Sequence, residues 1–121
     1  GFCMGGALTV LAASRVPEAD AGVIWYGYPP LEYVEASKIA MPLMAHWGTQ
    51  DSAFAIDGVD ALEAKLRDAG VRCEGHRYQA YHAFANECAQ GRNRIAITQY
   101  DAGWAQIAYD RTMRFFGRTL A

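Results

Sequence analysis

The chain opens on a cysteine between glycines, and this short stretch constrains the fold more than any other. Gly1-Phe2-Cys3-Met4-Gly5 has the form Gly-x-Cys-x-Gly, the pattern of a nucleophile elbow with cysteine in place of the commoner serine. In such an elbow a strand turns sharply into a helix, and the nucleophile lies at the strained corner. We expect Gly1 and Gly5 to need glycine, because a Cβ there would collide with the neighbouring strand or helix.

A helix is expected directly after this corner. Residues 7–14 are small and apolar, which is typical of a helix buried against a sheet, and we predict the helix over residues 3–15, ending before Pro17. Free N–H groups and the positive end of the helix dipole would favour the reactive thiolate form of Cys3. Cysteine is also often a small buried hydrophobic residue, so the motif alone leaves a catalytic and a structural role equally open.

The rest of the chain alternates between strand and helix patterns. Strands are predicted over residues 21–26, 41–47 and 71–78, the last nearer a sheet edge. Further helices are predicted over residues 57–69 and 101–120, with a long polar loop over residues 82–99. This order, with short connections, predicts an α/β fold with a parallel sheet and flanking helices.

Composition and charge exclude several kinds of partner. The 121 residues are 52% hydrophobic and 20% charged, which indicates one globular domain at most. The net charge of −2 gives no reason to expect nucleic acid or an anionic membrane, and no apolar run is long enough to span a bilayer. Cys3, Cys73 and Cys88 match neither a disulfide framework nor a zinc pattern, which predicts a reducing, cytoplasmic compartment.

The chain starts inside the elbow motif. No Met and no strand precede Gly1 in the sequence. We therefore expect residues 1–121 to be a partial domain that starts at the nucleophile elbow, with the N-terminal part of the domain absent. The alternative is that Gly1 is the loose end of a complete small domain.

Three chemically suited residues fall where strands of the predicted sheet end. Cys3 lies at the elbow, Asp51 follows the strand that ends at Trp47, and His82 follows the strand that ends at Tyr78. Parallel strands bring such residues to one edge, and the order nucleophile, acid, histidine is that of the α/β-hydrolase triad. His82 could take the thiol proton, and Asp51 could fix the imidazole tautomer. Singly, Asp51 could cap a turn and His82 could be an ordinary loop residue; their agreement in type, order and place favours a triad.

The other histidines and cysteines are assigned structural roles. His46 has apolar neighbours within a strand and is interpreted as a hydrogen-bonded core histidine. His76 lies in the strand nearer the edge and is predicted to be solvated. Cys73 and Cys88 have no elbow motif and are interpreted as structural or incidental.

Taken together, the sequence resembles the dienelactone hydrolase family. The resemblance is carried by residues 1–6, 47–51, 82–86 and 100–116. It implies that the fold is the C-terminal half of an α/β-hydrolase, with Cys3, Asp51 and His82 as the triad and with no metal or organic cofactor. It also implies that the backbone N–H of Met4 is one oxyanion-hole donor. The second donor would come from an N-terminal loop that this sequence lacks.

The resemblance implies cleavage of a small-molecule ester or lactone through a thioester, in which the thiolate attacks and water resolves the acyl-enzyme. Dienelactone-cleaving members carry an arginine four residues after the histidine to bind a carboxylate, whereas this sequence has Asn86 there. Arg92 or Arg94 could substitute for it, and Tyr26 and Tyr28 could line the substrate pocket. Tyr26 and Asn86 are the candidate substrate-binding residues.

Two other functions are compatible with the same residues. One is an inactive or partner-dependent hydrolase fragment, which needs the missing N-terminal segment to complete its sheet. The other is a redox or thiol-transfer role for an exposed Cys3. The redox role expects a resolving cysteine nearby, whereas Cys73 and Cys88 lie on other predicted elements.

Overall fold

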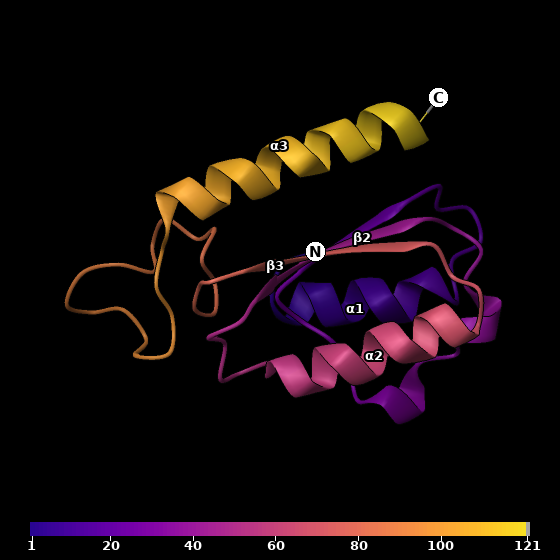
Figure 1. The fold of residues 1–121 in the computed structure, drawn as a ribbon, viewed down its shortest axis with the longest axis horizontal. Coiled ribbons are helices and arrows are strands. Elements are labelled where there is room, and N and C mark those ends of the chain that lie inside the picture. Colours follow the sequence, from indigo (N-terminus) through magenta and orange to yellow (C-terminus); the bar gives the residue numbers. More distant parts are fainter. Residues whose placement is uncertain (121) are drawn as a thin grey trace.

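The computed structural model describes residues 1–120, which form three layers with the sheet in the middle (Figure 1). The strands, all parallel and in the order β1-β2-β3, are β1 (Gly22–Trp25), β2 (Leu43–Gly48) and β3 (Cys73–Tyr78). Two helices cover one face and α3 covers the other; they are α1 (Met4–Ala13), α2 (Ile56–Asp68) and α3 (Ala102–Thr119). The predicted α/β class with a parallel sheet and flanking helices is confirmed.

An apolar core fills the space on each side of the sheet. Because successive strand residues point to opposite faces, each buried strand contributes to both cores. The core beneath the helix pair includes Val10, Ile24, Leu43, Val59 and Leu62. The core beneath α3 includes Trp25, Met44, Tyr78, Ala108 and Phe115. The uniform apolar character of the first two predicted strands reflects this double burial, whereas β3 is partly exposed, as expected nearer an edge.

The first residues of the chain extend the sheet beyond β1. Phe2 pairs with Trp25 in a parallel bridge. The Cys3 N–H donates to the Trp25 carbonyl at 2.9 Å, and the Trp25 N–H donates to the Gly1 carbonyl at 2.9 Å. Cys3 therefore leaves the sheet at the same edge as the carboxyl ends of β1, β2 and β3, the edge from which the long loop after β3 departs at the left of Figure 1.

The last helix, α3, lies across the sheet and brings residues late in the chain to this edge. Its N-cap is Asp101, whose carboxylate accepts a hydrogen bond from the Trp104 N–H at 2.9 Å. The buried face carries Ala105, Ala108 and Phe115. None of the helices within residues 1–120 has both the length and the apolar content that crossing a bilayer requires.

Candidate active site

The corner at Cys3 has the geometry of the predicted elbow. Cys3 has a φ of 56°, in the left-handed region that is costly for a residue with a Cβ. The turn is tight enough that a Cβ at Gly1 would overlap the Gly5 carbonyl, and a Cβ at Gly27 would overlap the Cys3 carbonyl oxygen. Backbone from the loop after β1 is thus pressed directly against the corner, which holds the strained conformation in place.

The prediction that position 5 also requires glycine is wrong, because residues 1–120 leave room for a side chain there. A Cβ at Gly5 would meet nothing within 4 Å. The close approach is made one residue later, at Gly6, where a Cβ would lie 2.9 Å from the Trp25 carbonyl oxygen. Gly6 is a buried residue of α1, facing the sheet. The helix therefore turns Gly6, rather than Gly5, toward β1.

Three side chains from different loops meet at the carboxyl edge of the sheet. Cys3 Sγ lies 3.1 Å from His82 Nε2, and His82 Nδ1 lies 2.8 Å from Asp51 Oδ2. Asp51 and His82 are both buried, whereas Cys3 is partly exposed. The structure thus brings together all three residues expected from the sequence. The histidine stands between the thiol and the carboxylate.

Neighbouring groups fix the orientation of both buried members. The second oxygen of Asp51, Oδ1, accepts hydrogen bonds from the N–H groups of Ala53 and Phe54, each at 2.8 Å. The His82 ring lies near the Tyr26 ring, at 5.3 Å between centroids, and near the Phe54 ring, at 5.5 Å. The backbone thus anchors the Asp51 carboxylate, and the aromatic neighbours restrict the His82 ring. Both residues are therefore held in the orientation in which His82 contacts Cys3.

A pocket of about 420 Å³ opens beside the thiol and the imidazole. Tyr26 and Asn86 line it, as expected from the sequence. Its other lining residues, which the sequence did not identify, are Phe2, Ala83, Ala85, Ile95, Thr98 and Tyr109. No Lys or Arg is among these residues, and no group of three or more metal-ligating side chains that could hold a metal ion is found within residues 1–120.

Tyr28 does not line this pocket, so that prediction is wrong. Its hydroxyl donates to the Ala55 carbonyl at 2.9 Å, and its ring packs against Trp47 and Phe54. Tyr28 lies two residues beyond Tyr26 and after Gly27, in the segment that leaves the sheet. The chain has turned between the two tyrosines, which sends their side chains into different environments.

The arginines proposed as substitutes near Asn86 are also absent from the pocket lining. The Arg94 guanidinium donates to the Thr98 carbonyl at 2.9 Å and to the Gly91 carbonyl at 3.3 Å, and so braces its own loop. Arg92 is exposed. The Asn86 side-chain oxygen accepts from the Cys88 N–H at 2.9 Å, closing a turn at the rim of the pocket.

Met4 is the first residue of α1. An N–H in the first turn of a helix has no intrahelical acceptor. The next two amides already have partners, since the Gly5 N–H donates to the Phe2 carbonyl at 2.7 Å and the Gly6 N–H donates to the Cys3 carbonyl at 2.9 Å. The Met4 N–H, next to the thiol in the chain, forms no hydrogen bond within residues 1–120.

His46 is a hydrogen-bonded core histidine, as its apolar neighbours indicated. Its Nδ1 lies 2.8 Å from the Tyr78 hydroxyl, and its Nε2 lies 2.8 Å from the Thr112 hydroxyl. Burial, with smaller effects from His76 and Arg111, lowers the pKa of His46 to about 3. His76 is less solvated than predicted, because it is only partly exposed, stacks on His46 and lies 3.0 Å from Glu74.

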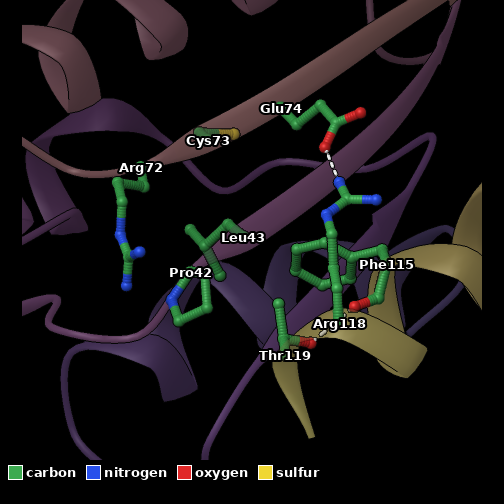
Figure 2. A pocket seen from close by; sticks show the side chains of 8 residues that line it. All are labelled: Pro42, Leu43, Arg72, Cys73, Glu74, Phe115, Arg118 and Thr119. Atoms are coloured by element: carbon green, nitrogen blue, oxygen red, sulfur yellow. Dashed lines mark hydrogen bonds and ion pairs between the residues drawn. The ribbon is translucent and has the colours of Figure 1, made fainter.

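Cys73 lies at the opposite, amino-terminal edge of the sheet, beside a cavity of about 360 Å³ (Figure 2). Burial raises the pKa of its thiol to about 12, and the nearby carboxylates of Glu63 and Glu74 act in the same direction. The Glu74 carboxylate pairs with Arg118, and both residues line this cavity (Figure 2). Cys73 is thus far from the triad edge and poorly suited to form a thiolate, which agrees with its assignment as a structural residue.

The sequence model of the dienelactone hydrolase family matches residues 1–120. A protein of Escherichia coli (strain K12), provisionally named carboxymethylenebutenolidase, is 31% identical over 126 residues, which are 96% of this chain and 44% of that protein. Protein usf of Aquifex pyrophilus is 31% identical over 118 residues, which are 96% of this chain and 48% of that protein. The chain therefore spans about half the length of these relatives.

Solved structures agree with the fold. A protein from Klebsiella pneumoniae subsp. pneumoniae, provisionally named dienelactone hydrolase, superposes with a TM-score of 0.81 at 28% identity, covering 97% of this chain and 50% of the other. A dienelactone hydrolase-like promiscuous phosphotriesterase from metagenomic libraries superposes with a TM-score of 0.86 at 21% identity, covering 98% of this chain and 50% of the other. The second likeness concerns the fold alone.

Proposed function

This chain belongs to the dienelactone hydrolase family, and we propose that it supplies the triad-bearing, C-terminal half of an enzyme that hydrolyses a carboxylic ester or lactone. The observation that carries the proposal is the continuous line of contacts from Cys3 Sγ through His82 to Asp51, at 3.1 and 2.8 Å. This is the arrangement that activates a thiol for attack on a carbonyl carbon. The hydrolase names of the relatives favour this function over a redox role.

The first half of the reaction forms a thioester. His82 Nε2 takes the thiol proton, and Cys3 Sγ forms a bond to the carbonyl carbon of the ester. The carbonyl oxygen becomes an oxyanion, and the Met4 N–H donates a hydrogen bond to it. When the carbon–oxygen bond of the ester breaks, the protonated imidazole gives its proton to the departing alkoxide. Asp51 holds the Nδ1–H tautomer and stabilises the imidazolium in between.

The second half releases the acid. His82 removes a proton from a water molecule, whose oxygen attacks the thioester carbon. The carbon–sulfur bond then breaks, the imidazole returns its proton to the sulfur, and the carboxylic acid leaves. Tyr26 and Asn86 contact the substrate in this proposal, since both line the pocket beside Cys3. No cofactor takes part in either half.

The rest of the domain is also part of the proposal. Because the chain spans 44% and 48% of two relatives, we propose that residues 1–121 are a partial α/β-hydrolase domain. An N-terminal segment would complete the sheet and provide the second oxyanion donor. A reducing, cytoplasmic compartment fits a mechanism that needs a free thiol at Cys3, and all three cysteines are free.

The test uses the full-length protein and p-nitrophenyl acetate. We expect hydrolysis with an initial burst of nitrophenol, and mass spectrometry of the acid-quenched enzyme should find one acetyl group on Cys3. Cys3→Ala should abolish both signals, whereas the matched variant Cys88→Ala should retain them because Cys88 is exposed in the loop away from the triad contacts. Acetylation of another residue, or turnover by the Cys3→Ala variant, would contradict the proposed mechanism.

A further inference from the structure

Backbone strain within residues 1–120 is concentrated around one pocket. The non-glycine residues with positive φ are Cys3 at 56°, Tyr26 at 40° and Ala83 at 59°, and all three line the pocket beside the thiol. Such conformations are costly and persist where the surroundings enforce them, which is most often at functional sites. Cys3 is the proposed nucleophile and Ala83 follows His82 in the chain. Tyr26 is neither a member of the proposed triad nor adjacent to a member in the chain, so the triad does not explain its strained backbone.

Tyr26 is held rigidly at the end of β1. Its N–H donates to the His46 carbonyl at 2.9 Å, and the next residue, Gly27, packs so closely on the Cys3 carbonyl that no Cβ would fit. The ring meets the His82 ring edge-on at 5.3 Å and the Phe84 ring at 5.4 Å. Only 2% of the residue is exposed. The ring is therefore closely packed beside the imidazole, in the wall of the pocket that Cys3 also lines.

The hydroxyl of Tyr26 differs from those of its neighbours. The Tyr78 hydroxyl lies 2.8 Å from His46 Nδ1, and the Tyr28 hydroxyl donates to the Ala55 carbonyl. The Tyr26 hydroxyl forms no hydrogen bond within residues 1–120, although the residue lines the pocket. Burial raises the pKa of Tyr26 well above its usual value, and Tyr109 and Cys3 raise it further. The group is thus a protonated donor at the pocket wall with no acceptor within residues 1–120, so it is free to donate to a molecule in the pocket.

We propose that the Tyr26 hydroxyl donates a hydrogen bond to an oxygen of the bound ester, and that this contact strengthens as Cys3 attacks. The inference rests on the proposed hydrolase function and adds a donor beyond the triad and the Met4 N–H. Tyr26 acts as a hydrogen-bond donor and transfers no proton. Its strained backbone and the surrounding rings hold the hydroxyl in place before the substrate arrives.

The test is Tyr26→Phe in the full-length protein, assayed with p-nitrophenyl acetate. The ring contacts remain, so we expect an unchanged melting temperature and an unchanged rate of Cys3 alkylation by iodoacetamide. We expect kcat/KM to fall about 10- to 100-fold, mainly through kcat, because the lost hydrogen bond is strongest to a developing oxyanion. The matched control is Tyr28→Phe, which loses a hydroxyl bound outside the pocket and should keep wild-type kinetics.

The outcomes separate this inference from the proposed function. If the wild-type protein hydrolyses the ester and the kcat/KM of Tyr26→Phe stays within about twofold of the wild-type value, the inference is overturned but the proposed function is not. A Tyr26→Phe variant that loses several degrees of melting temperature would also overturn it, since the hydroxyl would then have a partner inside the protein. Absence of ester turnover in the wild-type protein would overturn both.

Discussion

The Asp51 carboxylate contacts His82 through one oxygen only. Oδ2 lies 2.8 Å from His82 Nδ1, while Oδ1 accepts the N–H groups of Ala53 and Phe54. The backbone of the loop after β2 thus fixes the carboxylate, and the carboxylate fixes the imidazole. The contacts of Oδ1 with the backbone orient the Asp51 side chain, whereas Oδ2 presents the negative charge to His82. A substitution that removes the charge can therefore leave the orientation intact.

Asp51→Asn separates these two contributions. The amide oxygen can still accept from Ala53 and Phe54, so the loop should keep its conformation. The amide nitrogen, placed opposite His82 Nδ1, would favour the wrong tautomer, and we expect kcat to fall on the order of 1000-fold with little change in melting temperature. Steady-state kinetics and calorimetry check this. Asp57→Asn, at an exposed position in the first turn of α2, is the control and should retain activity.

Alkylation should distinguish the three cysteines. Cys3 is partly exposed beside an imidazole, whereas burial raises the pKa of Cys73 to about 12. With limiting iodoacetamide at pH 7, we expect Cys3 to react at least about tenfold faster than Cys73 and faster than the exposed Cys88. Peptide mass spectrometry of the folded, full-length protein measures each rate. Equal labelling of all three thiols would contradict the assignment of Cys3 as the nucleophile.

The meeting of Cys3, Asp51 and His82 was predictable because topology, and not precise geometry, brings these residues together. Asp51 follows β2, His82 follows β3, and Cys3 follows Phe2, which bridges to Trp25 in β1. Parallel strands joined by helices end at one edge, so these residues meet there. Residue type and chain order then sufficed. The burial of His46 was also predictable, because apolar residues flank it in a strand that is buried on both faces.

The rest of the pocket was not predictable from local pattern. Ile95 and Thr98 come from a long loop without periodicity, and Tyr109 reaches the pocket only because of how α3 crosses the sheet. The prediction for Tyr28 was wrong because the chain turns at Tyr26, whose positive φ cannot be read from its residue type. The prediction for Gly5 was wrong because tertiary packing decides which face of α1 lies against the sheet. Each failure concerns a side-chain direction set by tertiary contacts.

Alanine at two glycines near the elbow should have opposite effects. Gly27→Ala places a Cβ onto the Cys3 carbonyl, so we expect loss of about 2 kcal/mol or more of stability and displacement of the thiol. Gly5→Ala meets nothing within 4 Å and lies in α1, so it should be tolerated or stabilise the helix by up to about 1 kcal/mol. Urea unfolding measures both. A stable, active Gly27→Ala variant would show that the contact at the elbow is loose.

The buried His46 should make the fold sensitive to acid. Its pKa is lowered to about 3 in the folded protein, whereas an unfolded chain has a histidine pKa near 6.5. Between these values the unfolded state binds the proton and the folded state does not. The His46 contribution to stability is therefore present above about pH 6.5 and falls by about 1.4 kcal/mol per pH unit as pH drops through the window.

Urea unfolding at pH 7, 6 and 5 checks this dependence by comparing the wild-type protein with His46→Gln. The glutamine can hydrogen-bond Tyr78 and Thr112 but does not titrate. The difference in unfolding free energy between the two proteins should shrink as the pH falls. Parallel curves would show that His46 is protonated inside the fold.

A groove of about 480 Å³ lies beside residues 1–2, the elbow segment, which bridges to Trp25, and it is also lined by residues of β1 and α3. Phe2, Trp25, Tyr109, Met113 and Phe116 give it an apolar lining. Phe2 is 47% exposed and Met113 is 63% exposed, and within residues 1–120 the elbow segment pairs only with β1, so its other side has no strand partner. An unpaired edge with apolar neighbours favours aggregation or pairing with another chain.

Residues 1–121 alone should behave differently from the full-length protein. Because the relatives are about twice as long, we expect their additional half to correspond to a segment that pairs with the elbow segment and fills the groove. Residues 1–121 alone should aggregate or bind other chains, which light scattering detects. Ester turnover should be at least about 100- to 1000-fold lower without the second oxyanion donor. Adding the segment should restore both solubility and turnover, and a soluble monomer of residues 1–121 with full activity would disprove the proposed boundary.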